Sequence, residues 1–230
     1  MASENRMNDC SVYLILWGTD QFIQRANWEE ATSLVQTGIQ WASTKSPSEL
    51  DYQIQILFAL TLIHVQLLSG MMGTFNMSEA FGAVSQQLAQ LRSSSGSSRS
   101  TLLYLSLYHL MMQLCSLHRT GETVFLSQLL VDFRGLIEDL RRQSADSSLL
   151  KQTSARFEFS WISPAFLIGF HSLLKGIHEQ NTDHMDRAMN LWNQSIDRLV
   201  QIQTRDPLIE RLIFELHANI ALSHLIRVIN

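Results

Sequence analysis

The sequence is poor in charged residues, glycine and proline, and each shortage narrows the fold. Charged residues make up 17% of the 230 positions and hydrophobic residues 46%, so the chain can bury a core and lacks the composition of a disordered protein. Ten glycines and three prolines are too few for a protein made of many short strands and tight turns. The composition therefore favours helices, and we expect an all-α fold.

The shortage of positive charge and of cysteine bears on partners and compartment. With a formal net charge of −4, the chain shows no basic surface of the kind that holds nucleic acid directly. Its two cysteines, Cys10 and Cys115, cannot build a disulfide framework, which fits a reducing compartment.

Long uninterrupted apolar runs are also missing. The longest, residues 54–68, is broken by Gln55, His64 and Gln66, so it predicts a buried helix rather than a membrane span. The first nine residues are polar and have no apolar core of a signal peptide. We expect a soluble protein of the nucleus or the cytosol, with no membrane partner.

The clearest positive signal lies between residues 160 and 203. Apolar residues recur there at helical spacing on both sides of the polar run 179–182, which predicts two antiparallel helices joined by a short turn. Ser163-Pro164 suits the start of the first helix, because the hydroxyl can accept from a free backbone N–H and proline needs none.

The same pattern repeats along the chain. It predicts four antiparallel helix pairs, at about 11–44, 48–92, 101–143 and 161–203, a last helix at 206–229, and an exposed Ser/Gly linker at 93–98. Asn27 is expected to cap the second helix, and Gly18 is expected to weaken the first. The nearly all-apolar helix at 101–118 should be buried between its neighbours.

An alignment of the second helices suggests an internal repeat. A small residue is followed four positions later by a bulkier one, in the pairs Ala31/Val35, Ala80/Val84, Ser127/Val131 and Ala188/Trp192. Small residues let helices approach closely, so we expect each pair to pack on the next, in a tetratricopeptide (TPR)-like α-solenoid that spans residues 1–230 as a single array. The five tryptophans are expected to pack inside it: Trp17, Trp28, Trp41, Trp161 and Trp192.

Three stretches give the chain a resemblance to a known family. They are Leu102–Leu140 with its Tyr-His-Leu-Met helix and its His118-Arg119-Thr120-Gly121 turn, Phe159–Leu199 with Trp161 and Arg187-Ala188, and Glu49–Ser69 with Phe58-Ala59-Leu60 and His64-Val65. In these stretches the chain resembles the TPR-type subunit of the cohesin loader, the smaller partner of adherin.

The resemblance implies a nuclear, chromatin-associated scaffold without catalytic activity or cofactor. It would bind the extended N-terminal segment of adherin and support loading of cohesin onto chromatin, and thereby sister-chromatid cohesion, chromosome partition and cell division in mitosis. Chromatin and cohesin would be indirect partners. Because family members are longer, this chain would be part of a longer protein. The apolar end at residues 225–229 also favours continuation or association there.

Polar and tyrosyl side chains within otherwise apolar helices are the candidates for partner binding. They are Gln55, His64, Tyr104, Tyr108, His171 and Lys175. The alternative is that these side chains line seams between hairpins or face water, since a buried polar group needs only a hydrogen-bond partner. A second set of residues is either a solvated face or a contact for an acidic partner: Arg141, Arg142, Arg205 and Arg211.

Catalytic and metal-binding patterns are weak. Cys115 and His118 have the spacing of one ligand pair, but a zinc site needs about four ligands and no second pair follows. No local pattern pairs a nucleophile with a base. Two other hypotheses remain: an adaptor in another complex of the ubiquitin-ligase or signalosome type, and an all-α enzyme or ligand binder, which would need a closed polar pocket.

Overall fold

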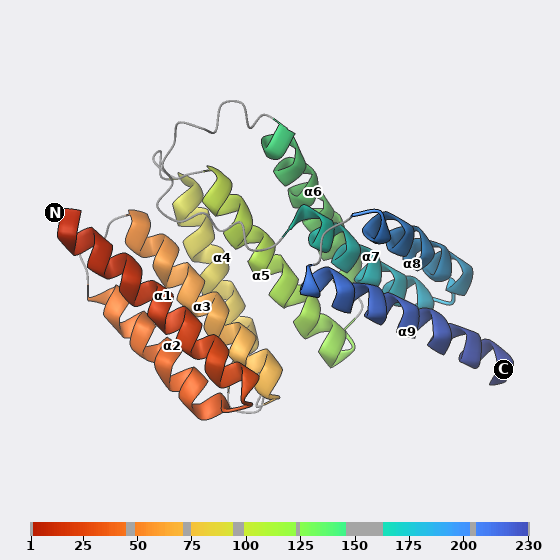
Figure 1. Ribbon diagram of the computed structural model, residues 1–230, viewed down its shortest axis with the longest axis horizontal. Coiled ribbons are helices and arrows are strands. Elements are labelled where there is room, and N and C mark those ends of the chain that lie inside the picture. The colour runs from red at the N-terminus through yellow and green to blue at the C-terminus, as the bar shows by residue number, and fades with distance from the viewer. Residues whose placement is uncertain are drawn as a thin grey trace. The chain divides into compact units, whose positions relative to one another are not determined.

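The computed structural model describes residues 2–44, 49–70, 75–93, 99–122, 125–145, 163–202 and 206–229. Every element in these ranges is an α-helix, so the protein is all-α, as its composition predicts (Figure 1). The chain forms two compact units, Met1–Ser116 (unit 1) and Leu117–Asn230 (unit 2).

Unit 1 contains four helices and most of a fifth. They are α1 (Ala2–Gln24), α2 (Trp28–Ser43), α3 (Glu49–Ser69), α4 (Met77–Ser93) and α5 (Arg99–Thr120), whose last turn belongs to unit 2. Successive helices pack on one another, α1 on α2, α2 on α3 and α3 on α4. Most of the expected linker, residues 94–98, lies outside the described residues, as does Trp161.

The first hairpin departs from expectation in three ways. Helix α1 begins at Ala2, nine residues before the apolar period becomes visible, and it runs through Gly18, where a Cβ would lie 2.8 Å from Leu34 Cδ2 of α2. The Asn27 side chain makes no cap hydrogen bond to α2. Trp17 is 55% exposed, so it is not a packing residue.

Helix α5 lies against both helices of the pair before it. Its side chains meet α3 and α4 through three polar pairs, namely His64 Nδ1 with Tyr108 Oη (3.0 Å), Ser85 Oγ with His109 Nε2 (3.4 Å) and Arg92 Nη2 with Ser106 Oγ (3.4 Å). Buried side chains occur all round α5, including Leu103, Leu105 and Met112, which confirms the expected burial of this helix.

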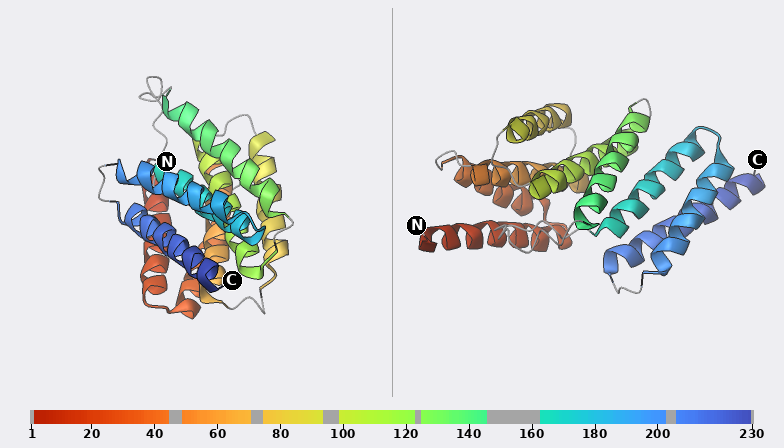
Figure 2. Two further views of the ribbon diagram at one scale, coloured as in Figure 1. Left: turned by 90° about the vertical axis from the view of Figure 1, so that its right-hand side faces the viewer. Right: turned by 90° about the horizontal axis from the view of Figure 1, so that it is seen from above.

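Unit 2 contains α6 (Leu126–Ala145), α7 (Pro164–Asn181), α8 (Met185–Val200) and α9 (Pro207–Ile229). The helices follow one another side by side, with α6 on α7 and α7 on α8 (Figure 2). Helix α9 packs against both α7 and α8. Thus α9 contacts both helices of the preceding pair, as α5 does in unit 1.

The α7–α8 hairpin is the most closely packed part of unit 2. Ser163 caps α7 by accepting from Phe166 N at 3.2 Å, as expected. Trp192 on α8 is fully buried, and its indole Nε1–H donates to Leu173 O at 3.2 Å. Gly176 provides the space for this indole, since a Cβ at that position would lie 2.1 Å from Trp192 Nε1.

The residue pairs of the repeat alignment are buried on two helices and exposed on a third. Ala31/Val35 on α2 and Ala188/Trp192 on α8 are all fully buried. On α4, Val84 is buried and Ala80 only half-buried. On α6, Ser127 is exposed and Val131 is 65% exposed, whereas Leu126 and Leu130 are buried. The packed register of α6 therefore lies one residue earlier than the alignment places it.

Within the described residues, two segments have the length and composition of a membrane span, Tyr52–Ser69 on α3 and Pro207–Ile229 on α9. In the first, 61% of the residues are buried within the fold, which is typical of a core helix. In the second, only 17% are buried, and side chains such as Phe214, Leu225 and Val228 are exposed. The apolar surface of α9 is therefore open in this structure.

Candidate functional site

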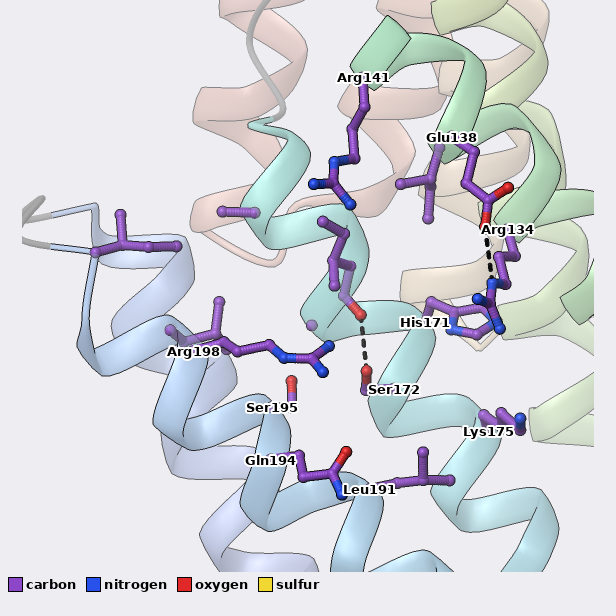
Figure 3. A pocket seen from close by; sticks show the side chains of 16 residues that line it. Arg134, Glu138, Arg141, His171, Ser172, Lys175, Leu191, Gln194, Ser195 and Arg198 are labelled. Atoms are coloured by element: carbon purple, nitrogen blue, oxygen red, sulfur yellow. Dashed lines mark hydrogen bonds and ion pairs between the residues drawn. The ribbon is translucent and has the colours of Figure 1, made fainter.

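A groove lies on unit 2 between α6, α7 and α8 (Figure 3). Its volume is about 680 Å³, and sixteen residues line it. Helix α7 contributes Gly169, His171, Ser172 and Lys175 to the lining, between side chains of α6 and α8. We call this hollow the α7 groove.

The walls of the α7 groove carry mainly positive charge. Arg134 and Arg141 come from α6, Lys175 from α7 and Arg198 from α8. Glu138 is the one carboxylate among the described residues of the lining, and it pairs with Arg134 at 3.0 Å. Because this pair is 65% and 46% exposed, water screens it and it contributes little to stability.

Three of the four cations make no ion pair with any described residue. Figure 3 shows Arg141 reaching from α6 and Arg198 from α8 toward the same space over α7. Arg134 and Arg141 form the α6 wall together because they are seven residues apart and so share one face of this helix. The arrangement can bind an anionic group from two sides.

His171 has a pKa that depends on burial and on the positive charges around it. Burial, together with nearby Lys175 and Arg134, lowers the pKa of His171 to about 4, so the ring is neutral at pH 7. The ring also stacks on buried Phe133 of α6, with 6.4 Å between ring centroids. His171 is thus a neutral, positioned group beside two cations.

The floor of the α7 groove is rigid and partly apolar. Gly169 brings α7 close to α8 and α9, since a Cβ there would lie 2.6 Å from Leu212 Cδ2 and 2.9 Å from Leu199 Cδ1. Leu199 and Ser195 of α8 are both 3% exposed. Helices packed this closely fix the backbone positions from which the wall side chains extend.

A second, smaller hollow continues from the first along α6 and α7. It measures about 250 Å³ and shares Arg134, His171 and Lys175 with the α7 groove. Glu179 and His178 line its far part, where His178 Nε2 lies 2.8 Å from Ser127 Oγ. The two hollows together form a track along α7.

The structure places the predicted site residues in two kinds of environment. In unit 1, the Gln55 amide donates to Ala42 O at 3.2 Å, and His64 and Tyr108 bond each other within the helix packing. Burial lowers the pKa of His64 and raises that of Tyr108. Tyr104 is half-buried on α5.

Only His171 and Lys175, of the six candidates, line the α7 groove. The sequence reasoning did not select Arg134, Glu138 or Arg198. The seven-residue spacing of Arg134 and Arg141 on one helix face was the signal that could have found the α6 wall.

The arginines that the sequence grouped together separate in space. Arg141 lines the groove, whereas Arg142 pairs with Asp139 at 3.0 Å and Arg211 pairs with Glu215 at 2.9 Å. Arg205 lies outside the described residues.

Groups suited to metal binding do not gather in the part of the chain that the structure describes. Burial raises the pKa of Cys115 to about 11, so its thiol stays protonated at neutral pH and is a poor nucleophile or metal ligand.

Comparison of the chain with models of known protein families, with curated proteins and with solved structures found no match.

Proposed function

We propose that the protein is a non-enzymatic, TPR-like helical-repeat scaffold of the cohesin-loader type, which binds the extended N-terminal segment of adherin. In this role it supports loading of cohesin onto chromatin in the nucleus. The family assignment rests on the resemblance of Leu102–Leu140, Phe159–Leu199 and Glu49–Ser69 to that family.

One packing observation carries the scaffold part of the proposal. Helix α5 contacts both α3 and α4, and α9 contacts both α7 and α8. This pattern supports a solenoid, in which each repeat packs on the repeat before it. The fully buried Ala31/Val35 and Ala188/Trp192 pairs support the same repeat.

A solenoid suits peptide binding because its grooves follow the helices and offer an extended path. The track along α7 supplies such a path, with cationic walls and a partly apolar floor. A generic helical-repeat adaptor in another complex is the second candidate, and the same packing favours it.

Co-purification separates the two. The full chain is expressed with an N-terminal fragment of adherin, and binding is measured by isothermal titration calorimetry. We expect a one-to-one complex with a dissociation constant in the micromolar range or below. If the folded chain captures other proteins from nuclear extract but not adherin, the adaptor replaces the cohesin-loader proposal.

A further inference from the structure

We propose that the α7 groove is the docking site for an acidic segment of a partner protein, whose carboxylates bind Arg141, Arg198 and Lys175. The inference rests on the proposed scaffold function and names the chemistry of the segment that this scaffold holds. The partner's apolar side chains, interspersed among the acidic ones, pack on half-buried apolar side chains of the lining, Ile168, Leu191 and Ile202.

Charge complementarity identifies the occupant. The described lining residues include four cations and one carboxylate, an excess of three positive charges on a chain whose net charge is −4. Glu138 neutralises Arg134, which leaves Arg141, Lys175 and Arg198 without a carboxylate partner among the described residues. Guanidinium groups bind carboxylates with two parallel hydrogen bonds, so opposed arginines suit a segment with acidic side chains on both edges.

The shape of the site favours a peptide over nucleic acid. The hollow is lined by apolar as well as charged groups, among them Leu191, Leu199 and Ile202, and it narrows along α7 into the smaller hollow. A duplex backbone instead needs a broad basic face that neutralises many phosphates, and three free cations are few for that. Glu179 lines the smaller hollow and would repel a carboxylate, so the acidic part of the segment lies in the α7 groove.

His171 supplies an internal reporter. Its pKa is lowered to about 4 by burial and by Lys175 and Arg134. A bound carboxylate would offset these positive charges, so the pKa of His171 rises when the groove is occupied. A segment that binds elsewhere on the protein leaves this pKa unchanged.

The test uses the full chain and a fluorescein-labelled peptide in which Glu residues are interspersed with Leu, with the same peptide carrying Gln in place of Glu (the Gln/Leu peptide) as its uncharged control. Fluorescence anisotropy gives the affinity, and NMR of the histidine rings gives the pKa of His171. We expect the Glu/Leu peptide to bind, with affinity falling as salt rises, and the Gln/Leu peptide to bind at least tenfold more weakly.

Two variants and a matched control locate the binding. Arg141→Glu and Arg198→Glu change exposed side chains, and each is expected to weaken binding by about tenfold or more. Arg142→Glu reverses the adjacent charge on the same helix but outside the groove, and it should change affinity by no more than about twofold. Equal affinities of Arg141→Glu and Arg142→Glu, or displacement of the peptide by duplex DNA, would overturn the inference.

The same variants distinguish this inference from the cohesin-loader proposal. If adherin binds the wild type and Arg141→Glu equally, the acidic-segment inference fails and the scaffold proposal stands. If adherin does not bind, but the Glu/Leu peptide binds and Arg198→Glu abolishes peptide binding, the groove is confirmed as a docking site and the cohesin-loader proposal fails.

Discussion

Two glycines in unit 2 should respond in opposite ways to the same substitution. Gly176 faces α8, and a Cβ added there would lie 2.1 Å from Trp192 Nε1 and 2.4 Å from Cε2. Gly135 lies within α6 with nothing within 4 Å of the added carbon. Replacing each with alanine therefore compares the same methyl group with and without a neighbour.

The magnitudes follow from three effects. Alanine in place of glycine within a helix stabilises the folded state by about 1 kcal/mol. At Gly135 this is the whole effect. At Gly176 the methyl forces the indole to move, at a cost of about 1–3 kcal/mol for overpacking. Displacing the indole also breaks its hydrogen bond to Leu173 O, a further loss of about 1 kcal/mol.

We therefore expect Gly176→Ala to lower the free energy of unfolding by about 1–3 kcal/mol, and Gly135→Ala to raise it by about 1 kcal/mol. Urea unfolding followed by far-ultraviolet circular dichroism measures both. Hydrogen exchange read by mass spectrometry should show faster opening of α7 and α8 in Gly176→Ala alone. If the two variants are equally stable, the close approach of α7 to Trp192 is wrong.

Two further predictions concern buried titratable groups. Burial lowers the pKa of His109 to about 4, below its unfolded value of 6.5, so its contribution to stability is complete above pH 6.5 and is lost as the pH falls toward 4. Because His109 is only 6% exposed, the loss is about 3 kcal/mol at most. When the wild type and His109→Gln are compared by urea unfolding, the stability of the variant should depend less on pH in this window. Because burial raises the pKa of Cys115 from 9.0 to about 11, its thiolate fraction is about 100-fold smaller at mildly alkaline pH. Iodoacetamide should therefore modify exposed Cys10 much faster than Cys115, and equal rates by mass spectrometry would contradict the burial of α5 at this position.

The helices could be predicted from the sequence because apolar residues at three- and four-residue steps are a local signal. The start of α1 could not, because residues 2–9 have no apolar period. The register of α6 was also out of reach. Leu126/Leu130 and Ser127/Val131 have the same spacing, and only the neighbouring helix α7 decides which pair is buried.

The candidate site shows the same limit. Polar residues on apolar helices single out His171 and Lys175, which line the α7 groove, but an identical signal singles out His64 and Tyr108, which bond each other inside unit 1. Arg141 and Arg142 are chemically the same and adjacent in sequence. Successive residues of a helix are rotated by about 100°, so Arg141 and Arg142 point in different directions. The position of α7 determines that Arg141, and not Arg142, lines the groove.

The two glycines of α7 also bear on how many ways the hairpin can assemble. Gly169 and Gly176 are seven residues apart, so both fall on one face, opposite Leu199 and Trp192. If α7 slid along α8 by one turn, Leu173 and Gln180 would occupy the two contact points, and Gln180 would lie against Trp192, where a single added Cβ already forces the indole to move. The two glycines therefore favour the observed alignment of α7 on α8, and with it the observed alignment of these two walls of the groove, over the alignment shifted by one turn.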